Sequence, residues 1–296
     1  MFEVFKNRLE ISGTLHTVTA LRVSMGRSLE PIGSDLPVIK DSLGRPLIPG
    51  SSFKGALRSR LESFLRGIFS EISNDELRHL VADPANENEW SITAKEMGEL
   101  KNKHQNDDLK LTEVILEKTD LVSRLFGSPW VSSKFQVRDL TIFDPENNWF
   151  GQYQERDGVA IDRDTETAAD GKLYDFQVVP GGTPFTFKAV VENAEPWELG
   201  LLMVGLHQFE TEQIPLGGGR SRGLGVVKLE ISEMQWVNPQ NPNELLDYLQ
   251  NLVSNTLDSY KLDENQQQEY KQEWTNALVT KLTDVRSHSP TATTAS

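Results

Sequence analysis

The sequence predicts an α+β protein whose elements follow the ferredoxin-like order of strand, helix, strands, helix and strand. Apolar and polar residues alternate over residues 9–18, which is the period of a half-buried strand. Helical patterns of apolar residues follow Pro49 and Pro196, and further strand-like runs cover residues 184–191 and 226–236. Large insertions between these elements and a helical carboxy-terminal extension complete the predicted fold.

The segment that joins the first strand to the first helix has no regular period. Residues 24–49 contain three glycines and four prolines, which predict a long irregular loop. Ser51 or Ser52 is then expected to cap the first helix, because a serine hydroxyl can accept a hydrogen bond from the free N–H groups at a helix start. The apolar face of this helix would consist of Phe53, Ala56, Leu57, Leu61, Phe64 and Leu65.

The middle of the chain carries two regions that do not resemble a core. Residues 71–120 are acidic and polar, and they indicate an insertion that packs lightly on the main domain. Residues 135–143 alternate as a further strand. The next stretch contains few apolar side chains, so we expect a protruding hairpin arm at about residues 151–175.

The second helix is expected to run from Pro196 to about Phe209. Residues 240–285 show helical spacing, and the Ser- and Thr-rich residues 286–296 are expected to be a disordered tail. The predicted organisation is therefore one domain over residues 1–237 and a helical extension over residues 238–296.

Composition limits the chemistry of this 296-residue chain. It has no cysteine, which excludes a disulfide scaffold, a thiol nucleophile and any thiolate metal site, and we expect no zinc. The formal net charge is −14, yet the first 70 residues carry ten basic and six acidic side chains. A site for a polyanion is therefore expected there and in a local basic loop. No apolar run is long enough to cross a bilayer, so we expect a cytoplasmic protein without a membrane partner.

The strongest local signal is the segment from Gly217 to Gly225, which has five glycines in nine residues. Glycines let a backbone approach a ligand closely, and the guanidinium groups of Arg220 and Arg222 can bind phosphate. The spacing matches neither a Walker loop nor a dinucleotide-binding motif. A tight turn with two solvated arginines explains the same residues equally well.

A second anion site is expected at the start of the first helix, where Ser51 and Ser52 precede Lys54 and Arg58. A capped amphipathic helix with a charged outer face is the simpler explanation of these residues. In the ferredoxin-like order, however, the loop before the last strand can approach the start of the first helix. The two sites would then converge, which suits a chain of phosphates.

Five motifs together resemble the repeat-associated mysterious protein (RAMP) superfamily over about residues 8–236. Within it, the chain looks like the backbone subunit of a type III CRISPR effector complex, with subtype III-D as the expected subtype. The motifs are Gly13 in the first strand, IPGSSFKGALR at residues 48–58, LFGS at residues 125–128, VAIDR at residues 159–163 and the glycine-rich loop at residues 217–225.

The resemblance implies a modified RNA-recognition-motif fold whose copies bind guide RNA (crRNA), while an arm flips out one base at each repeat. The implied partners are the guide RNA, the target RNA, other RAMP subunits and the large signature subunit. The arm would include Ile161, Asp162 and Arg163. The residues implied to bind guide phosphates are Arg22, Ser51, Ser52, Lys54, Arg58, Gly217, Gly218, Gly219, Arg220, Ser221 and Arg222.

The resemblance also implies that Asp35 is catalytic, because members that cut target RNA carry an aspartate in the corresponding loop. One carboxylate can bind a divalent ion or help to activate a 2′-hydroxyl, which suffices to cleave RNA. The expected cofactor is therefore Mg²⁺ or Mn²⁺, with Asp35 as a possible ligand. The simpler explanation of Asp35 is an aspartate that forms a turn before Leu36 and Pro37.

Three alternatives to target cleavage remain open. The chain could be a structural assembly subunit without an active centre, and the role of Asp35 distinguishes that function. It could instead be a stand-alone endoribonuclease that processes guide RNA, whose catalytic histidine would have to be His16. An unrelated alternative is a small-molecule enzyme with a phosphate site, which predicts a closed nucleotide pocket and no protruding arm.

Overall fold

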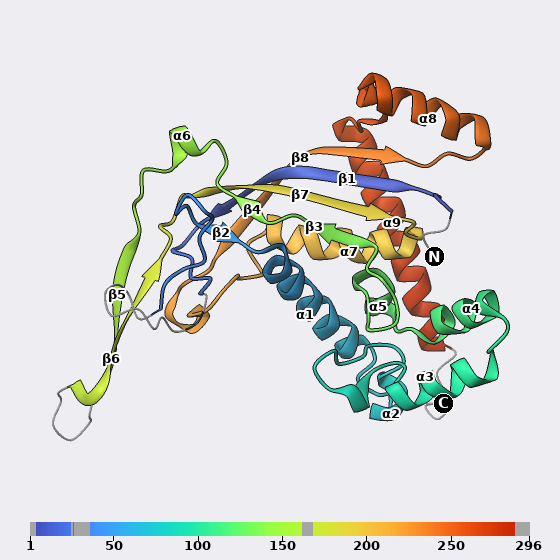
Figure 1. The fold of residues 1–296 in the computed structure, drawn as a ribbon, viewed down its shortest axis with the longest axis horizontal. Helices are drawn as coiled ribbons and strands as arrows, with labels where there is room; N and C mark the ends of the chain where they lie inside the picture. The colour runs from blue at the N-terminus through green and yellow to red at the C-terminus, as the bar shows by residue number, and fades with distance from the viewer. Residues whose placement is uncertain (1–3, 25, 27–35, 162–167, 288–296) are drawn as a thin grey trace.

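The computed structural model describes residues 4–24, 26, 36–161 and 168–287. The predicted α+β class is confirmed. Four strands form an antiparallel sheet in the order β3-β7-β1-β8. They are β1 (Arg8–Thr17), β3 (Phe135–Val137), β7 (Pro184–Glu192) and β8 (Val227–Val237). In Figure 1 the sheet lies above the helices that cover one of its faces.

Two helices form the layer beneath the sheet and make the crossovers between its strands. Helix α1 (Gly50–Ile68) lies between β1 and β3 in the chain, and α7 (Pro196–Glu210) lies between β7 and β8. Their aromatic side chains meet under the sheet: the Phe53 ring centroid is 4.3 Å from that of Phe209 and 5.0 Å from that of Phe187. This cluster fixes how the start of α1 sits relative to the end of α7.

The carboxy-terminal extension joins the same core. It contains α8 (Pro242–Ser254), η3 (Leu257–Tyr260) and α9 (Glu264–Ser287), and α9 packs along α7 (Figure 1). Trp274 and Leu278 of α9 are buried in the main hydrophobic cluster. The helix continues to Ser287, so residues 286 and 287 of the predicted tail are helical, and residues 288–296 lie outside the described residues.

The insertion at residues 71–120 is helical and contacts the main domain at the far end of α1. It forms α2 (Asn74–Leu77), η1 (Glu87–Glu89), α3 (Ala94–Lys103) and α4 (Asp108–Lys118), and α5 (Leu121–Phe126) follows it. Val81 belongs to the main hydrophobic cluster, and Arg66 of α1 donates a hydrogen bond to the Ala82 carbonyl at 3.1 Å. Helices α2, η1 and α4 have no buried residue, so the insertion reaches the main core at few positions, which agrees with the prediction of light packing.

The predicted strand at residues 135–143 is divided between two sheets. Its first part is β3, whereas its second part is β4 (Leu140–Thr141), which pairs with β2 (Leu47–Ile48). Asp139, between them, accepts a hydrogen bond from the Gly50 N–H at 2.8 Å. The side chain at the break therefore ties this connection to the first residue of α1.

The predicted arm is present as a two-stranded hairpin that projects away from the main sheet (Figure 1). Its strands are β5 (Gln154–Ile161) and β6 (Ala168–Val178), and α6 (Pro145–Asn148) precedes them. The remaining short element, η2 (Arg220–Arg222), lies inside the glycine-rich loop. No helix among the described residues has both the length and the apolar character that a membrane crossing requires.

A buried ion pair connects the edge of the sheet to the start of α7. Lys134 Nζ lies 2.5 and 2.8 Å from the two carboxylate oxygens of Glu198, and the side chains are 9% and 1% exposed. The Glu198 carboxylate also accepts a hydrogen bond from the Glu195 N–H at 2.7 Å. Both charges therefore depend on each other for compensation.

We predict that Lys134→Met lowers the free energy of unfolding by about 3–5 kcal/mol, because it leaves the Glu198 carboxylate buried without its cation. Urea denaturation monitored by circular dichroism measures the loss. Lys134→Met/Glu198→Gln should recover most of it, because glutamine is uncharged and can still accept from Glu195. A single variant as stable as the wild type would contradict this role of the pair.

Candidate nucleic-acid interface

The start of α1 and the glycine-rich loop line one groove of about 540 Å³. This is the convergence that the order of elements predicts. We call it the α1 groove. Its lining residues are Ser51, Ser52, Gly55, Ala56, Ser59, Arg60, Ser63, Gln213, Ile214, Pro215, Gly217 and Arg220.

The glycine-rich loop is held against the segment that leaves β1. Gly218 N–H donates to the Arg22 carbonyl at 2.8 Å, and Gly225 N–H donates to the Ala20 carbonyl at 2.9 Å. Gly217 has φ +72°, and a Cβ there would overlap the Arg22 backbone. Glycine is therefore required at this point for the close approach of the two chain segments.

Serine does not cap α1, contrary to the prediction. The helix begins at Gly50 after Pro49, so Ser51 and Ser52 lie within its first turn and line the α1 groove. The Asp139 carboxylate instead accepts the Gly50 N–H. Since Asp139 is 89 residues away in the sequence, local spacing could not identify it.

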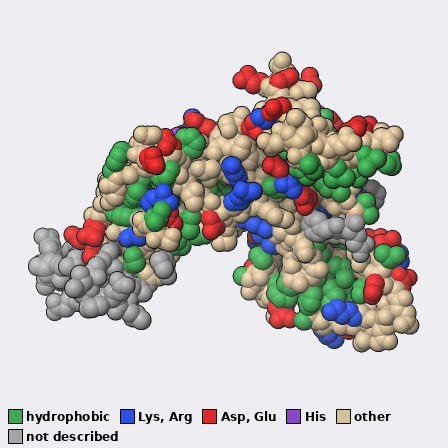
Figure 2. Space-filling model, turned by 45° about the horizontal axis from the view of Figure 1, so that its top comes forward, with side chains coloured by type: hydrophobic (Ala, Val, Ile, Leu, Met, Phe, Trp, Pro, Cys, Tyr) green, Lys and Arg blue, Asp and Glu red, His purple; other side chains and the backbone are tan. Residues whose placement is uncertain are grey.

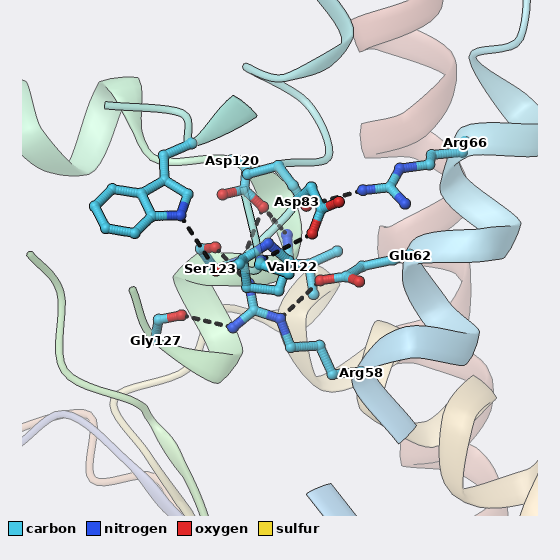
Figure 3. A network of polar contacts seen from close by, with 12 residues as sticks. Arg58, Glu62, Arg66, Asp83, Asp120, Val122, Ser123 and Gly127 are labelled. Atoms are coloured by element: carbon cyan, nitrogen blue, oxygen red, sulfur yellow. Dashed lines mark hydrogen bonds and ion pairs between the residues drawn. The ribbon is translucent and has the colours of Figure 1, made fainter. Parts of the chain in front are cut away.

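Lys54 and Arg58 lie on a different face of α1 from the α1 groove. Arg58 donates to Glu62, to the Ser123 hydroxyl and to the Gly127 carbonyl, at 2.7, 3.0 and 3.0 Å (Figure 3). Lys54 Nζ is 2.6 Å from the Ser133 hydroxyl. The structure therefore does not bring these two predicted residues to the groove, and their binding of phosphate stays a prediction.

Burial, together with the nearby positive charge of Arg58, lowers the pKa of Lys54 to about 8. Burial has the opposite effect on the acidic neighbour and raises the pKa of Glu62, although the hydrogen bond from Arg58 to the Glu62 carboxylate opposes this rise. The charged groups on this face of α1 thus interact mainly with other groups of the protein.

Arg60 lines the groove, although the sequence motifs did not predict it as a binding residue. Its Nε donates to Gln208 Oε1 at 2.8 Å, and its guanidinium carbon lies 4.6 Å from the Phe64 ring centroid. Phe64, predicted to be in the core, is 39% exposed beneath it. The spacing of Ser52, Ser59 and Ser63 along one helix face was the signal that could have found this surface.

Arg22 and Arg222 lie at the base of the arm rather than among the groove-lining residues. The Arg22 guanidinium carbon is 4.8 Å from the Phe176 ring centroid, and Arg222 Nη1 donates to the Tyr174 hydroxyl at 2.6 Å. The other predicted residues of the glycine-rich loop, Gly218, Gly219 and Ser221, are not among the residues that line the α1 groove. Figure 2 shows Lys and Arg side chains gathered along the middle of one face, so the acidic total does not prevent a local basic surface.

Three predicted residues, Asp35, Asp162 and Arg163, lie outside the described residues. Ile161 ends β5, where its backbone pairs with Ala168. In the part of the chain that the structure describes, no three His, Asp or Glu side chains gather closely enough to hold a metal ion. The divalent ion expected at Asp35 therefore stays a prediction.

Comparison with known proteins gives one family and several relatives. The RAMP superfamily model matches residues 14–228, which include α1, the arm and the glycine-rich loop. CRISPR system Cms endoribonuclease Csm3 of Enterococcus italicus is 24% identical over 233 residues, 78% of this chain and 94% of that protein. Csm3 of Methanocaldococcus jannaschii is 26% identical over 228 residues, 75% and 79% of the two chains. Csm3 of Mycobacterium tuberculosis is 45% identical over 56 residues, 18% of this chain and 24% of that protein.

The pKa of Lys54 predicts a pH dependence of stability. The pKa is about 8 in the folded protein, against about 10.4 in an unfolded chain. Between these values the unfolded chain binds a proton that the folded protein has released, so the wild type should gain stability relative to Lys54→Met as pH rises.

Urea denaturation of both proteins at about pH 7 and about pH 10 measures this difference, and the comparison cancels the titration of other groups. Lys228→Met, which removes an exposed lysine, is the matched control and should show no comparable change. A constant or falling difference between wild type and Lys54→Met would contradict the lowered pKa.

Proposed function

This chain belongs to the RAMP superfamily, and we propose that it is a backbone subunit of a type III CRISPR effector complex that binds the phosphates of guide RNA. The relatives named CRISPR system Cms endoribonuclease Csm3 support this proposal. Its partners would be the guide RNA, the target RNA, other RAMP subunits and the large signature subunit. Assignment to subtype III-D stays a prediction.

The observation that carries the proposal is the α1 groove. Arg60 and Arg220 line the same groove as Ser51 and Ser52, which brings two guanidinium groups and two hydroxyls to one surface. Guanidinium, hydroxyl and backbone N–H groups are the donors that proteins use for phosphate oxygens, and they read no base sequence. A groove of this kind suits a guide whose sequence changes while its backbone stays the same.

The strand order supports the finer assignment of the fold. A sheet ordered β3-β7-β1-β8, with α1 and α7 as its crossovers, is the arrangement that the ferredoxin-like plan generates. We infer a modified RNA-recognition-motif fold. The β5–β6 hairpin would then be the arm that displaces one base, and Ile161 with the predicted residues Asp162 and Arg163 would act near that base.

We further propose that Asp35 supports cleavage of target RNA beside the arm. Leu36, the next residue, forms a bridge with Phe176 of β6, and its carbonyl accepts from the Gln177 N–H at 3.1 Å. The loop that carries Asp35 therefore ends at the base of the arm. In the proposed reaction a 2′-hydroxyl gives its proton to the Asp35 carboxylate as its oxygen bonds to the adjacent phosphorus. The bond from phosphorus to the 5′-oxygen breaks, that oxygen takes a proton from water, and a 2′,3′-cyclic phosphate remains. Mg²⁺ or Mn²⁺ is the proposed cofactor, but no step of this scheme depends on it.

Removing a groove arginine should weaken RNA binding for all sequences alike. We predict that Arg60→Ala and Arg220→Ala each reduce the slope of log affinity against log salt by about one, because each removes one phosphate contact. Fluorescence anisotropy with labelled single-stranded RNAs of different sequence measures affinity and slope.

Lys110→Ala is the matched control for these variants, because Lys110 is an exposed cation of the insertion that pairs with Glu113. It should leave the slope unchanged. If Arg60→Ala and Arg220→Ala changed the preference for RNA sequence but not the slope, the assignment of the groove to phosphates would be wrong.

Asp35→Ala should preserve guide binding and target pairing but reduce target cleavage by about 10²–10⁴-fold, the usual effect of losing one acid–base group. Gel analysis of labelled target RNA with the assembled complex measures the cut, and Asp75→Ala in the insertion is the control. A 2′-deoxy substitution at the scissile nucleotide should also block cleavage. Unchanged cleavage by Asp35→Ala would exclude the catalytic role, and no cleavage by the wild type would favour a structural assembly subunit.

A further inference from the structure

The two arginines of the glycine-rich loop serve different places. Arg220 lines the α1 groove, and its Nε donates to the Gly217 carbonyl of its own loop at 3.2 Å. Arg222 is not among the residues that line the groove. Its Nη1 donates instead to the hydroxyl of Tyr174, which belongs to strand β6 of the arm. A residue of the arm thus determines where one of the loop cations is held.

The position of the Tyr174 ring depends on the residue across the hairpin. Tyr174 pairs with Gly158 of β5, and a Cβ at Gly158 would lie only 2.7 Å from the Tyr174 hydroxyl oxygen. The ring therefore lies across the glycine, in space that any other residue would fill. Gly158 allows the hydroxyl to reach Arg222.

A second aromatic residue on the same face of β6 contacts a second arginine. Phe176 lies two positions after Tyr174, and the two ring centroids are 6.1 Å apart. The Arg22 guanidinium stacks on Phe176, and its buried Nε has no hydrogen-bond partner among the described residues. Two predicted phosphate-binding arginines therefore contact aromatic side chains of β6, Arg22 through the Phe176 ring and Arg222 through the Tyr174 hydroxyl.

We propose that Tyr174 is a positioning residue of the RNA site, which holds the Arg222 guanidinium at the base of the arm for a phosphate of the bound strand. This inference rests on the proposed function and extends it from the groove to the arm. A guanidinium has five N–H donors, and the bond to Tyr174 occupies one of them, so four remain for RNA. An exposed arginine loses considerable rotamer freedom when it binds, and prior ordering by Tyr174 reduces that loss.

The decisive variant is Tyr174→Phe, which removes one oxygen and leaves the ring and the charge of Arg222 in place. Affinity for a labelled single-stranded RNA of mixed sequence should fall about three- to tenfold, the usual effect of one hydrogen bond. The salt slope should stay unchanged, because no cation is lost, whereas Arg222→Ala should reduce that slope by about one. Tyr174→Phe/Arg222→Ala should bind no more weakly than Arg222→Ala alone, because the hydroxyl acts only through Arg222.

Two further variants separate positioning from a general effect on folding. Gly158→Ala should displace the Tyr174 ring and reduce affinity to the level of Tyr174→Phe, without a further loss when both changes are combined. Tyr260→Phe removes a phenol hydroxyl in η3, beyond the opposite end of β8, and should leave affinity unchanged. Thermal denaturation of each variant checks that it is folded at the temperature of the binding measurement.

Wild-type affinity in Tyr174→Phe would overturn the inference, and so would an equal loss in the presence and absence of Arg222, which would mean that Tyr174 contacts RNA itself. Both results leave the proposed function intact if Arg220→Ala still weakens binding. Failure of the wild-type protein to bind RNA, or binding that is insensitive to Arg60→Ala and Arg220→Ala, would instead overturn the proposed function together with this assignment of Tyr174.

Discussion

The central position of β1 is the constraint on which the rest of the structure depends. It forms hydrogen bonds with β7 along one edge and with β8 along the other, so its register sets the places of both strands and of α7 between them. Where the chain leaves β1, the N–H groups of Val18 and Thr19 donate to the Val226 carbonyl, and the Arg22 carbonyl accepts from Gly218. The glycine-rich loop is therefore fixed by the same strand that organises the sheet, and the α1 groove follows from this arrangement.

The cations of α1 differ in how many protein groups they contact, and this difference distinguishes the face of the helix that packs against the protein from the face that lines the groove. Arg58 has three protein partners, one of them Ser123 of α5, and Lys54 is partly buried and contacts Ser133, in the segment that follows α5. Arg60, on the adjacent face, has one polar partner and lines the groove with Arg220. A net charge of −14 is compatible with a polyanion site because the exposed cations, rather than the total, determine the local field.

The segments outside the four-stranded sheet and its two crossover helices support α1 and α7. Helix α9 covers α7 with Trp274 and Leu278, and residue 278 lies 50 residues beyond the end of the family match. The insertion at residues 71–120 secures the far end of α1 through Arg66 and Val81. Because Asp139 binds the Gly50 N–H at the start of α1, this helix is held at both ends. Rigid elements under a binding surface reduce the entropy that binding would otherwise cost.

The sequence by itself determined the local structure and the convergence of two loops. The alternation of residues 9–18, the apolar period after Pro49 and Pro196 and the polar stretch of the arm all encode elements that the structure contains. Only the tertiary structure decided that Asp139 caps α1, that Arg60 faces the groove while Arg58 does not, and that α9 enters the core. The period of apolar residues along the sequence predicts whether a side chain is buried. The group that this side chain contacts depends on which distant segments the fold brings together.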